Sequence, residues 1–97
     1  MMEAKEEIIG IINKQLKMPH YKIFFFGSRA AGKGTERSDI DVGIEAAEAV
    51  PAKIFFQIKD EMDNIRIMQK IDLVDFCKVS DEFKQYAMRD IKVIYEK

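Results

Sequence analysis

Apolar residues recur along the chain with two periods, one helical and one alternating, and this pattern predicts both helices and strands. Helices are expected at residues 3–17, 51–65 and about 80–90. Strands are expected at residues 21–26, 40–45, 70–77 and 92–95. Pro51 favours a helix start because proline fits the first helical position, and the Ser80 hydroxyl can cap the third helix. The chain therefore mixes helices and strands, and it contains no internal repeat.

The segment between the first two predicted strands, residues 28–38, holds small, glycine and charged residues and lacks apolar periodicity. A parallel connection needs about a dozen residues or more, usually including a helix, so this segment favours antiparallel pairing of the two strands. In such a hairpin Gly27, which ends the first strand, lies beside Asp39, which begins the second. A parallel crossover would place the two residues at opposite edges of the sheet.

Composition narrows the class of protein. The chain has 97 residues, of which 47% are hydrophobic, and we expect residues 1–97 to form a single domain with one core. Sixteen basic and 17 acidic residues give a net charge of -1, which argues against autonomous nucleic-acid binding through a broad basic surface. The one cysteine, Cys77, cannot form an internal disulfide, and no secretory signal or membrane span is visible, so we expect a cytoplasmic location.

Candidate chemistry gathers around the predicted hairpin. Asp39 and Asp41 are two residues apart on a strand, so both carboxylates face the same side of the sheet. Such a pair repels unless a cation lies between its members, and Mg²⁺ takes carboxylate oxygens together with substrate phosphates. Gly27 lets its backbone approach a phosphate closely, and Ser28 adds a hydroxyl donor. These residue types indicate metal-dependent phosphoryl transfer.

These residues resemble the pattern of the nucleotidyltransferases of the DNA polymerase beta superfamily, which is Gly-Ser, a short spacer and Asp-x-Asp. The pattern stands here as Gly27-Ser28 followed by Asp39-Ile40-Asp41. The chain looks most like the minimal nucleotidyltransferases, and the resemblance covers nearly its whole length. It implies an α/β (α+β) fold in which helices flank a small mixed sheet. It also implies two Mg²⁺ ions on Asp39 and Asp41, and a nucleoside triphosphate whose phosphates lie against Gly27 and Ser28.

The family has a third carboxylate on a later strand, and the predicted third strand offers Asp72 and Asp75, which face opposite sides. We favour Asp72, because it lies in the family's hydrophobic-Asp-hydrophobic pattern and because Ile71, Leu73 and Cys77 on the other face would pack under a helix. Asp72 would then bind metal and help to deprotonate the attacking hydroxyl. Asp75 would have to lie near a strand end or pair with a basic residue, and the sequence leaves this point open.

The resemblance implies Mg²⁺-dependent transfer of AMP from ATP to a hydroxyl on a protein, with Lys33 and Arg37 as candidate contacts to the leaving phosphates. We expect the 97 residues to lack an added domain for the acceptor, and we therefore expect acceptor recognition to come from elsewhere. The resemblance to the family implies that the acceptor is a small helical protein of the HEPN class. This partner would be a toxin whose RNase activity is silenced by its antitoxin. An unpaired strand edge near residues 93–95, or apolar helix residues, could contact the partner.

Two alternatives compete with this interpretation. Residues 27–33 match the glycine and lysine positions of a phosphate loop, but Gly34 stands where that loop needs Ser or Thr, and no long helix follows. The second alternative is a non-catalytic binding module that neutralises its partner by complex formation alone. The carboxylates Asp39, Asp41 and Asp72 argue against this second alternative without excluding it.

Overall fold

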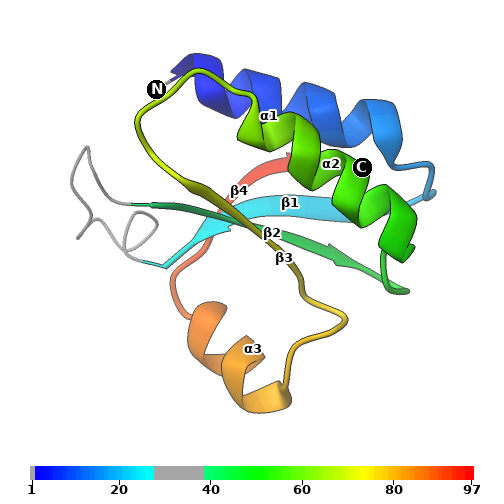
Figure 1. The fold of residues 1–97 in the computed structure, drawn as a ribbon. Coiled ribbons are helices and arrows are strands. Elements are labelled where there is room, and N and C mark those ends of the chain that lie inside the picture. The colour runs from blue at the N-terminus through cyan, green and yellow to red at the C-terminus, as the bar shows by residue number, and fades with distance from the viewer. Residues whose placement is uncertain (1, 28–38) are drawn as a thin grey trace.

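The computed structural model describes residues 2–27 and 39–97 of the chain. Its helices are α1 (Met2–Gln15), α2 (Ala52–Asp63) and α3 (Asp81–Ala87). Its strands are β1 (Tyr21–Phe26), β2 (Ile40–Ala46), β3 (Ile71–Asp75) and β4 (Lys92–Glu96). Helices α1 and α2 lie side by side on one face of the sheet and α3 lies on the other (Figure 1). The predicted order of helices and strands is therefore confirmed within the described residues.

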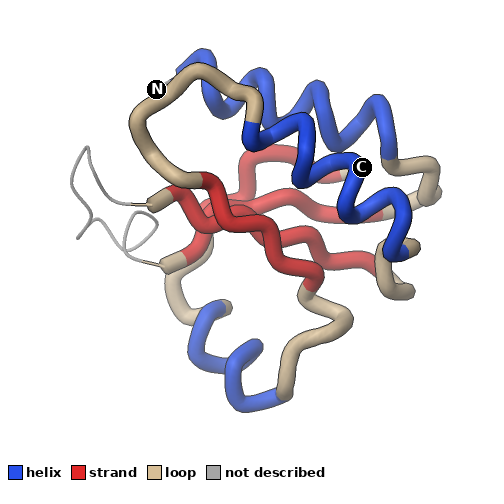
Figure 2. Tube along the Cα trace, viewed as in Figure 1, coloured by secondary structure: helices blue, strands red, loops and turns tan. Residues whose placement is uncertain are grey.

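The four strands form one mixed sheet in the order β3-β2-β1-β4. Strand β1 pairs antiparallel with both β2 and β4, whereas β2 pairs parallel with β3. The antiparallel pairing of β1 with β2 confirms the prediction made from the segment between them. Because β2 and β3 are parallel, the chain must cross back over the sheet between them, and α2 makes this crossover (Figure 2). Strand β4 forms an edge of the sheet, as expected.

Alternating residues of the strands supply two apolar layers, one on each face of the sheet. The layer under α1 and α2 is made of Ile8, Ile12, Leu16, Tyr21, Ile23, Ile40, Val42, Ile44, Val50, Ile58, Met62, Ile65, Ile71 and Leu73. The layer under α3 is smaller and mainly aromatic, with Phe24, Phe26, Phe76 and Ala87. Gly43 is needed in this second layer, because a β-carbon there would lie 2.5 Å from the Phe24 ring and 2.6 Å from the Phe76 ring.

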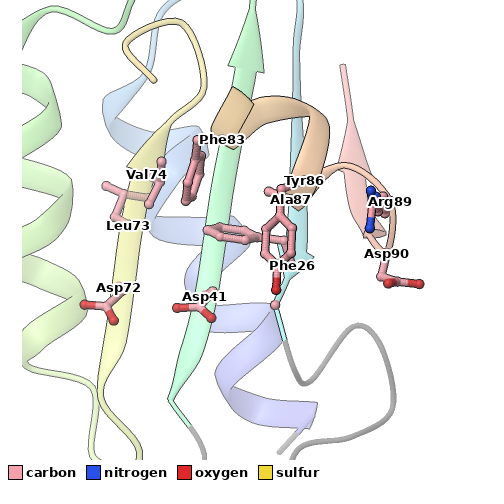
Figure 3. A pocket seen from close by; sticks show the side chains of 11 residues that line it. Phe26, Asp41, Asp72, Leu73, Val74, Phe83, Tyr86, Ala87, Arg89 and Asp90 are labelled. Atoms are coloured by element: carbon pink, nitrogen blue, oxygen red, sulfur yellow. The ribbon is translucent and has the colours of Figure 1, made fainter. Parts of the chain in front are cut away.

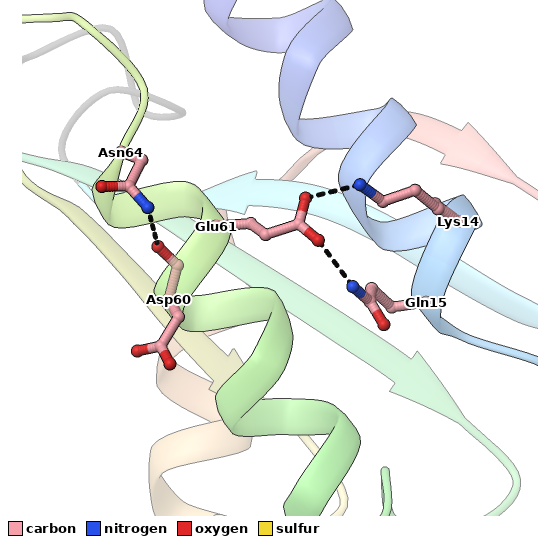
Figure 4. A network of polar contacts seen from close by, with 5 residues as sticks. All are labelled: Lys14, Gln15, Asp60, Glu61 and Asn64. Carbon is pink, nitrogen blue, oxygen red and sulfur yellow. Dashed lines mark hydrogen bonds and ion pairs between the residues drawn. The ribbon is translucent and has the colours of Figure 1, made fainter.

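A polar contact at the surface also joins the two helices that cover the first layer. Glu61 of α2 accepts hydrogen bonds from Lys14 Nζ at 2.8 Å and from Gln15 Nε2 at 2.6 Å, both near the end of α1 (Figure 4). These hydrogen bonds lower the pKa of Glu61, the one from Lys14 more than the one from Gln15. The carboxylate of Glu61 therefore favours the packing of α1 on α2 when it is charged.

Two local predictions about residue positions were wrong and one was confirmed. Pro51 stands one residue before α2 rather than at its first helical position. Cys77 is exposed rather than part of the core, because β3 ends at Asp75 and Phe76 takes the buried place. The hydroxyl of Ser80 accepts a hydrogen bond from the Phe83 backbone N–H at 3.1 Å, which confirms the predicted cap of α3. Among the described residues, no helix has the length and apolar character needed to cross a membrane.

Candidate active site

Two carboxylates lie next to each other on the sheet face that carries α3. Asp41 near the start of β2 is the register partner of Asp72 in the parallel strand β3, and on its other side it is the partner of Phe26 in β1. Residues at matching positions of paired strands point to the same face, and Figure 3 shows both carboxylates there. Asp39 stands exposed just before β2. Of the two candidates on β3, Asp72 is therefore the one that lies beside Asp41.

The electrostatics of this end of the sheet centre on Asp41. Burial raises the pKa of Asp41 above its usual value, and the negative charges of Asp72 and then Asp39 raise it further. The three carboxylates therefore interact unfavourably when all are charged. Among residues 2–27 and 39–97, the cation that touches the group is Lys70, whose Nζ lies 3.7 Å from Asp72 Oδ1 in an exposed ion pair. A divalent cation at Asp41 and Asp72 would relieve the remaining repulsion.

Gly27 follows the last residue of β1 and lies directly against Asp41. Its φ is +78°, a left-handed conformation that glycine adopts without the strain a side chain would bring. A β-carbon on Gly27 would lie 2.4 Å from Asp41 Oδ2, closer than any side chain could remain without displacing the carboxylate. Glycine at this position therefore makes room for the Asp41 carboxylate as well as setting the backbone conformation.

Asp75 has a different environment from Asp72. It is buried, with 5% of its surface exposed, and it is the last residue of β3. Its Oδ2 accepts a hydrogen bond from the Val50 backbone N–H at 2.8 Å, and its Oδ1 accepts one from the Cys77 backbone N–H at 2.9 Å. Asp75 therefore ties the segment before α2 to the end of β3. The sequence left open whether Asp75 lies near a strand end or pairs with a basic residue. In the structure it lies at the end of β3.

A pocket of about 720 Å³ opens beside the two carboxylates. Its sheet side is lined by Phe26, Gly27, Asp41, Asp72, Leu73 and Val74. Its other side is lined by α3 and the residues after it, namely Phe83, Tyr86, Ala87, Arg89 and Asp90 (Figure 3). This second side was not predicted from the sequence. The spacing of Phe83 and Tyr86, three residues apart on a short helix, was the available signal, since such residues share a helix face.

Ser28, Lys33 and Arg37, the expected phosphate contacts beside Gly27, lie outside the described residues. Within residues 2–27 and 39–97, no three His, Cys, Asp or Glu side chains converge as a metal site. Mg²⁺ is commonly bound through only one or two carboxylates, with waters and substrate phosphates supplying the other ligands. The pair of Asp41 and Asp72 fits that mode of binding, and it does not form an all-protein cage.

Asp41, Asp72 and Gly27 thus lie together at one end of a mixed sheet that carries helices on both faces. The family model "Polymerase beta, Nucleotidyltransferase" matches residues 6–97, and the chain belongs to this family. The resemblance seen in the motif and the predicted fold class are thereby confirmed.

Two relatives extend this finding. A protein of Haemophilus influenzae named "Probable protein adenylyltransferase MntA" is 28% identical over 98 residues, which cover 99% of this chain and 86% of the relative. A second relative, from Methanocaldococcus jannaschii, is also named as a protein adenylyltransferase. It is 39% identical over 78 residues. That match covers 75% of this chain and 90% of the relative.

Solved structures share the fold. A crystal structure of a toxin-antitoxin with AMP-PNP matches with a TM-score of 0.75 and 22% identity, over 94% of this chain and 72% of that one. A chain in the structure of a tri-AMPylated HEPN toxin of Shewanella oneidensis in complex with MNT antitoxin matches with a TM-score of 0.73 and 19% identity. That match covers 97% of this chain and 71% of the matched one. At these identities the likeness concerns the fold alone.

Proposed function

We propose that this protein is a protein adenylyltransferase, which transfers AMP from ATP to a hydroxyl of a partner protein and releases pyrophosphate. The observation that carries the proposal is the pairing of Asp41 with Asp72 in register, on the pocket face and beside Gly27. The names of the two relatives support the choice of AMP as the transferred group and of a protein as the acceptor.

In the proposed reaction the acceptor hydroxyl oxygen bonds to the α-phosphorus of ATP. The bond between that phosphorus and the bridging oxygen of pyrophosphate breaks, and the electron pair leaves with pyrophosphate. Asp72 takes the hydroxyl proton, because its carboxylate lies at the pocket wall in register with Asp41. Asp41 must be charged to act, and its raised pKa means that it gives up its proton less readily than an ordinary aspartate.

Asp39, Asp41 and Asp72 would hold Mg²⁺, two ions by analogy with the family. When bound, Mg²⁺ neutralises charge on the phosphate oxygens and on the carboxylates. Gly27 presents its backbone to the phosphates, and Ser28, Lys33 and Arg37 stay predictions as further phosphate contacts. The single-domain organisation of residues 1–97 and a cytoplasmic location are parts of the same proposal.

The proposed partner is a small helical protein of the HEPN class, and this chain would be its antitoxin. The support is the fold shared with antitoxin chains solved together with such toxins. Strand β4 at the sheet edge is a candidate contact, since Val93 is 43% exposed there and an edge strand has unpaired backbone groups. In the alternative, a non-catalytic module, the same surface would neutralise the partner by binding alone.

The test is to incubate the purified chain with the HEPN-type protein encoded beside it, with MgATP, and to measure the intact mass of that partner. We expect an increase by one or more AMP units, which disappears with Asp41→Asn and with Asp72→Asn. Partner RNase activity is measured in parallel. If the native chain leaves the partner's mass unchanged and Asp41→Asn still suppresses its RNase activity, the enzymatic proposal is wrong and the binding module is right.

A further inference from the structure

Helix α3 brings two aromatic side chains to the pocket, and their surroundings differ. The ring of Phe83 packs edge-on against Phe26, with a centroid distance of 6.1 Å. Tyr86 is 71% exposed, and among the described residues its ring contacts no other aromatic ring. Its hydroxyl is directed toward the end of the sheet at which Asp41 and Asp72 lie (Figure 3). Phe83, although 39% exposed, therefore packs on the aromatic layer under α3, whereas Tyr86 offers its ring to the pocket.

Among the described residues, a cation lies beside the Tyr86 ring. The guanidinium carbon of Arg89 lies over the ring, 6.0 Å from its centroid, which is within the range of a cation–π contact. Both residues line the pocket. The guanidinium lies over one face of the ring, so the opposite face is the one on which a second planar group would stack. Stacking on an aromatic ring is how many proteins hold a base without reading its edge.

We propose that Tyr86 is the platform on which the base of the nucleoside triphosphate stacks. This inference rests on the proposed function, because it assumes that the phosphates lie at the carboxylate-lined part of the pocket. A pocket of about 720 Å³ is large enough for a nucleotide. Its two ends have matching chemistry: Asp41 and Asp72 suit metal-bound phosphates, and the wall of α3 suits a flat, weakly polar ring.

Tyr86 would contribute to the affinity for the nucleotide and to its position in the pocket, and not to the chemical step. Its ring contributes stacking, so a phenylalanine should replace it and an alanine should not. A base-free probe should not sense the substitution at all, because tripolyphosphate has only the groups that the carboxylate-lined end would bind. This contrast separates loss of stacking from general damage to the pocket.

The experiment titrates the full chain by calorimetry with MgATP and, separately, with magnesium tripolyphosphate. The native chain should bind MgATP more tightly than tripolyphosphate. Tyr86→Ala should weaken MgATP binding from about 5-fold to about 100-fold, the range that one stacked base supplies, with tripolyphosphate binding unchanged. Tyr86→Phe should keep MgATP affinity within about twofold, since the ring remains. Phe56→Ala is the matched control, because Phe56 is an exposed aromatic residue, at 59%, outside the pocket.

The outcomes are distinguishable. Equal MgATP affinities of the native chain and Tyr86→Ala would overturn the stacking role while leaving the proposed function standing. Loss of the partner complex in Tyr86→Ala, with MgATP affinity unchanged, would likewise overturn it and would make Tyr86 a protein contact. A native chain that binds neither probe would contradict the proposed function itself, and the stacking role with it.

Discussion

The backbone of Gly27 lies against the carboxylate of Asp41, so that a β-carbon on Gly27 would be 2.4 Å from Asp41 Oδ2. The glycine at the end of β1 and the aspartate near the start of β2 are thus coupled directly, before any substrate is present. In a Gly-Ser motif the glycine is readily explained by the approach of a phosphate. Here it has a second reason, which is the space occupied by the proposed metal ligand.

We expect Gly27→Ala to displace Asp41 and to impair transfer severely, by about 100-fold, because misplacing a reacting group by about 1 Å costs that much. The left-handed backbone adds a stability cost of about 1–2 kcal/mol for a residue with a side chain. The measurements are the rate of AMP transfer to the partner and the midpoint of urea unfolding. Gly10→Ala is the control: Gly10 lies in α1 with nothing within 4 Å of its added β-carbon.

The control should stabilise the chain by about 0.5–1 kcal/mol, since alanine is the better helix former, and should leave transfer unchanged. Full activity in Gly27→Ala would show that Asp41 moves away from the added methyl group without loss of function. The close approach of Gly27 and Asp41 would then not be needed for AMP transfer.

Asp41→Asn should stabilise the protein at neutral pH while abolishing transfer. The pKa of Asp41 is raised in the folded state, so the folded state holds this proton more firmly than the unfolded state does. The free energy of unfolding therefore falls as pH rises from the usual aspartate pKa, about 3.9, through the raised value, and stays lowered above it. Asparagine removes this penalty. Thermal unfolding at pH 7 should shift upward in the variant, and the shift should vanish toward pH 3.

Asp63→Asn is the control for charge alone, because Asp63 is an exposed residue at the end of α2. Addition of Mg²⁺ should narrow the gap between the native chain and Asp41→Asn at pH 7, since a bound cation relieves the same repulsion. Equal stabilities of the native chain and Asp41→Asn at every pH from 3 to 8 would contradict this explanation of Asp41.

Much of the fold could be predicted because its signals are local. Helical and alternating periods identify the elements, and the Ser80 cap depends on residues three positions apart. What could not be predicted depends on distant chain segments. The burial of Asp75 rests on the backbone of Val50, and Cys77 was misplaced because only the end of β3 decides that Phe76 turns inward. The position of Tyr86 at the pocket depends on how α3 packs under the sheet.

The contact between α1 and α2 should weaken in acid. The hydrogen bonds from Lys14 and then Gln15 lower the pKa of Glu61, so its contribution to stability is present above the unfolded glutamate pKa and is lost as pH falls through the lowered value. Glu61→Gln should therefore lower the midpoint of thermal unfolding slightly at pH 7 and not at pH 3. The effect should shrink in high salt, because the pair is exposed. An equal loss at both pH values would point to packing of the side chain instead.

The two aspartates of β3 should respond oppositely to the same substitution. Asp75→Ala leaves the buried Val50 N–H and the Cys77 N–H without their acceptor, and we expect a loss of about 2–4 kcal/mol in the free energy of unfolding. Asp72→Ala removes a half-buried carboxylate with one exposed ion pair, so stability should change by less than about 1 kcal/mol while AMP transfer is lost.

Urea unfolding and transfer to the partner, measured on both variants, give the comparison, and Asp75→Asn provides an intermediate. An amide oxygen at position 75 can accept one of the two hydrogen bonds, whereas its NH₂ group meets the other donor. Asp75→Asn should therefore be destabilised less than Asp75→Ala, and it should transfer AMP at temperatures where it is folded. A folded Asp75→Asn that transfers no AMP, beside an Asp72→Ala that does, would exchange the roles assigned to the two residues. The in-register pairing of Asp72 with Asp41 argues against that result, because a residue three positions further along the strand faces the opposite side of the sheet.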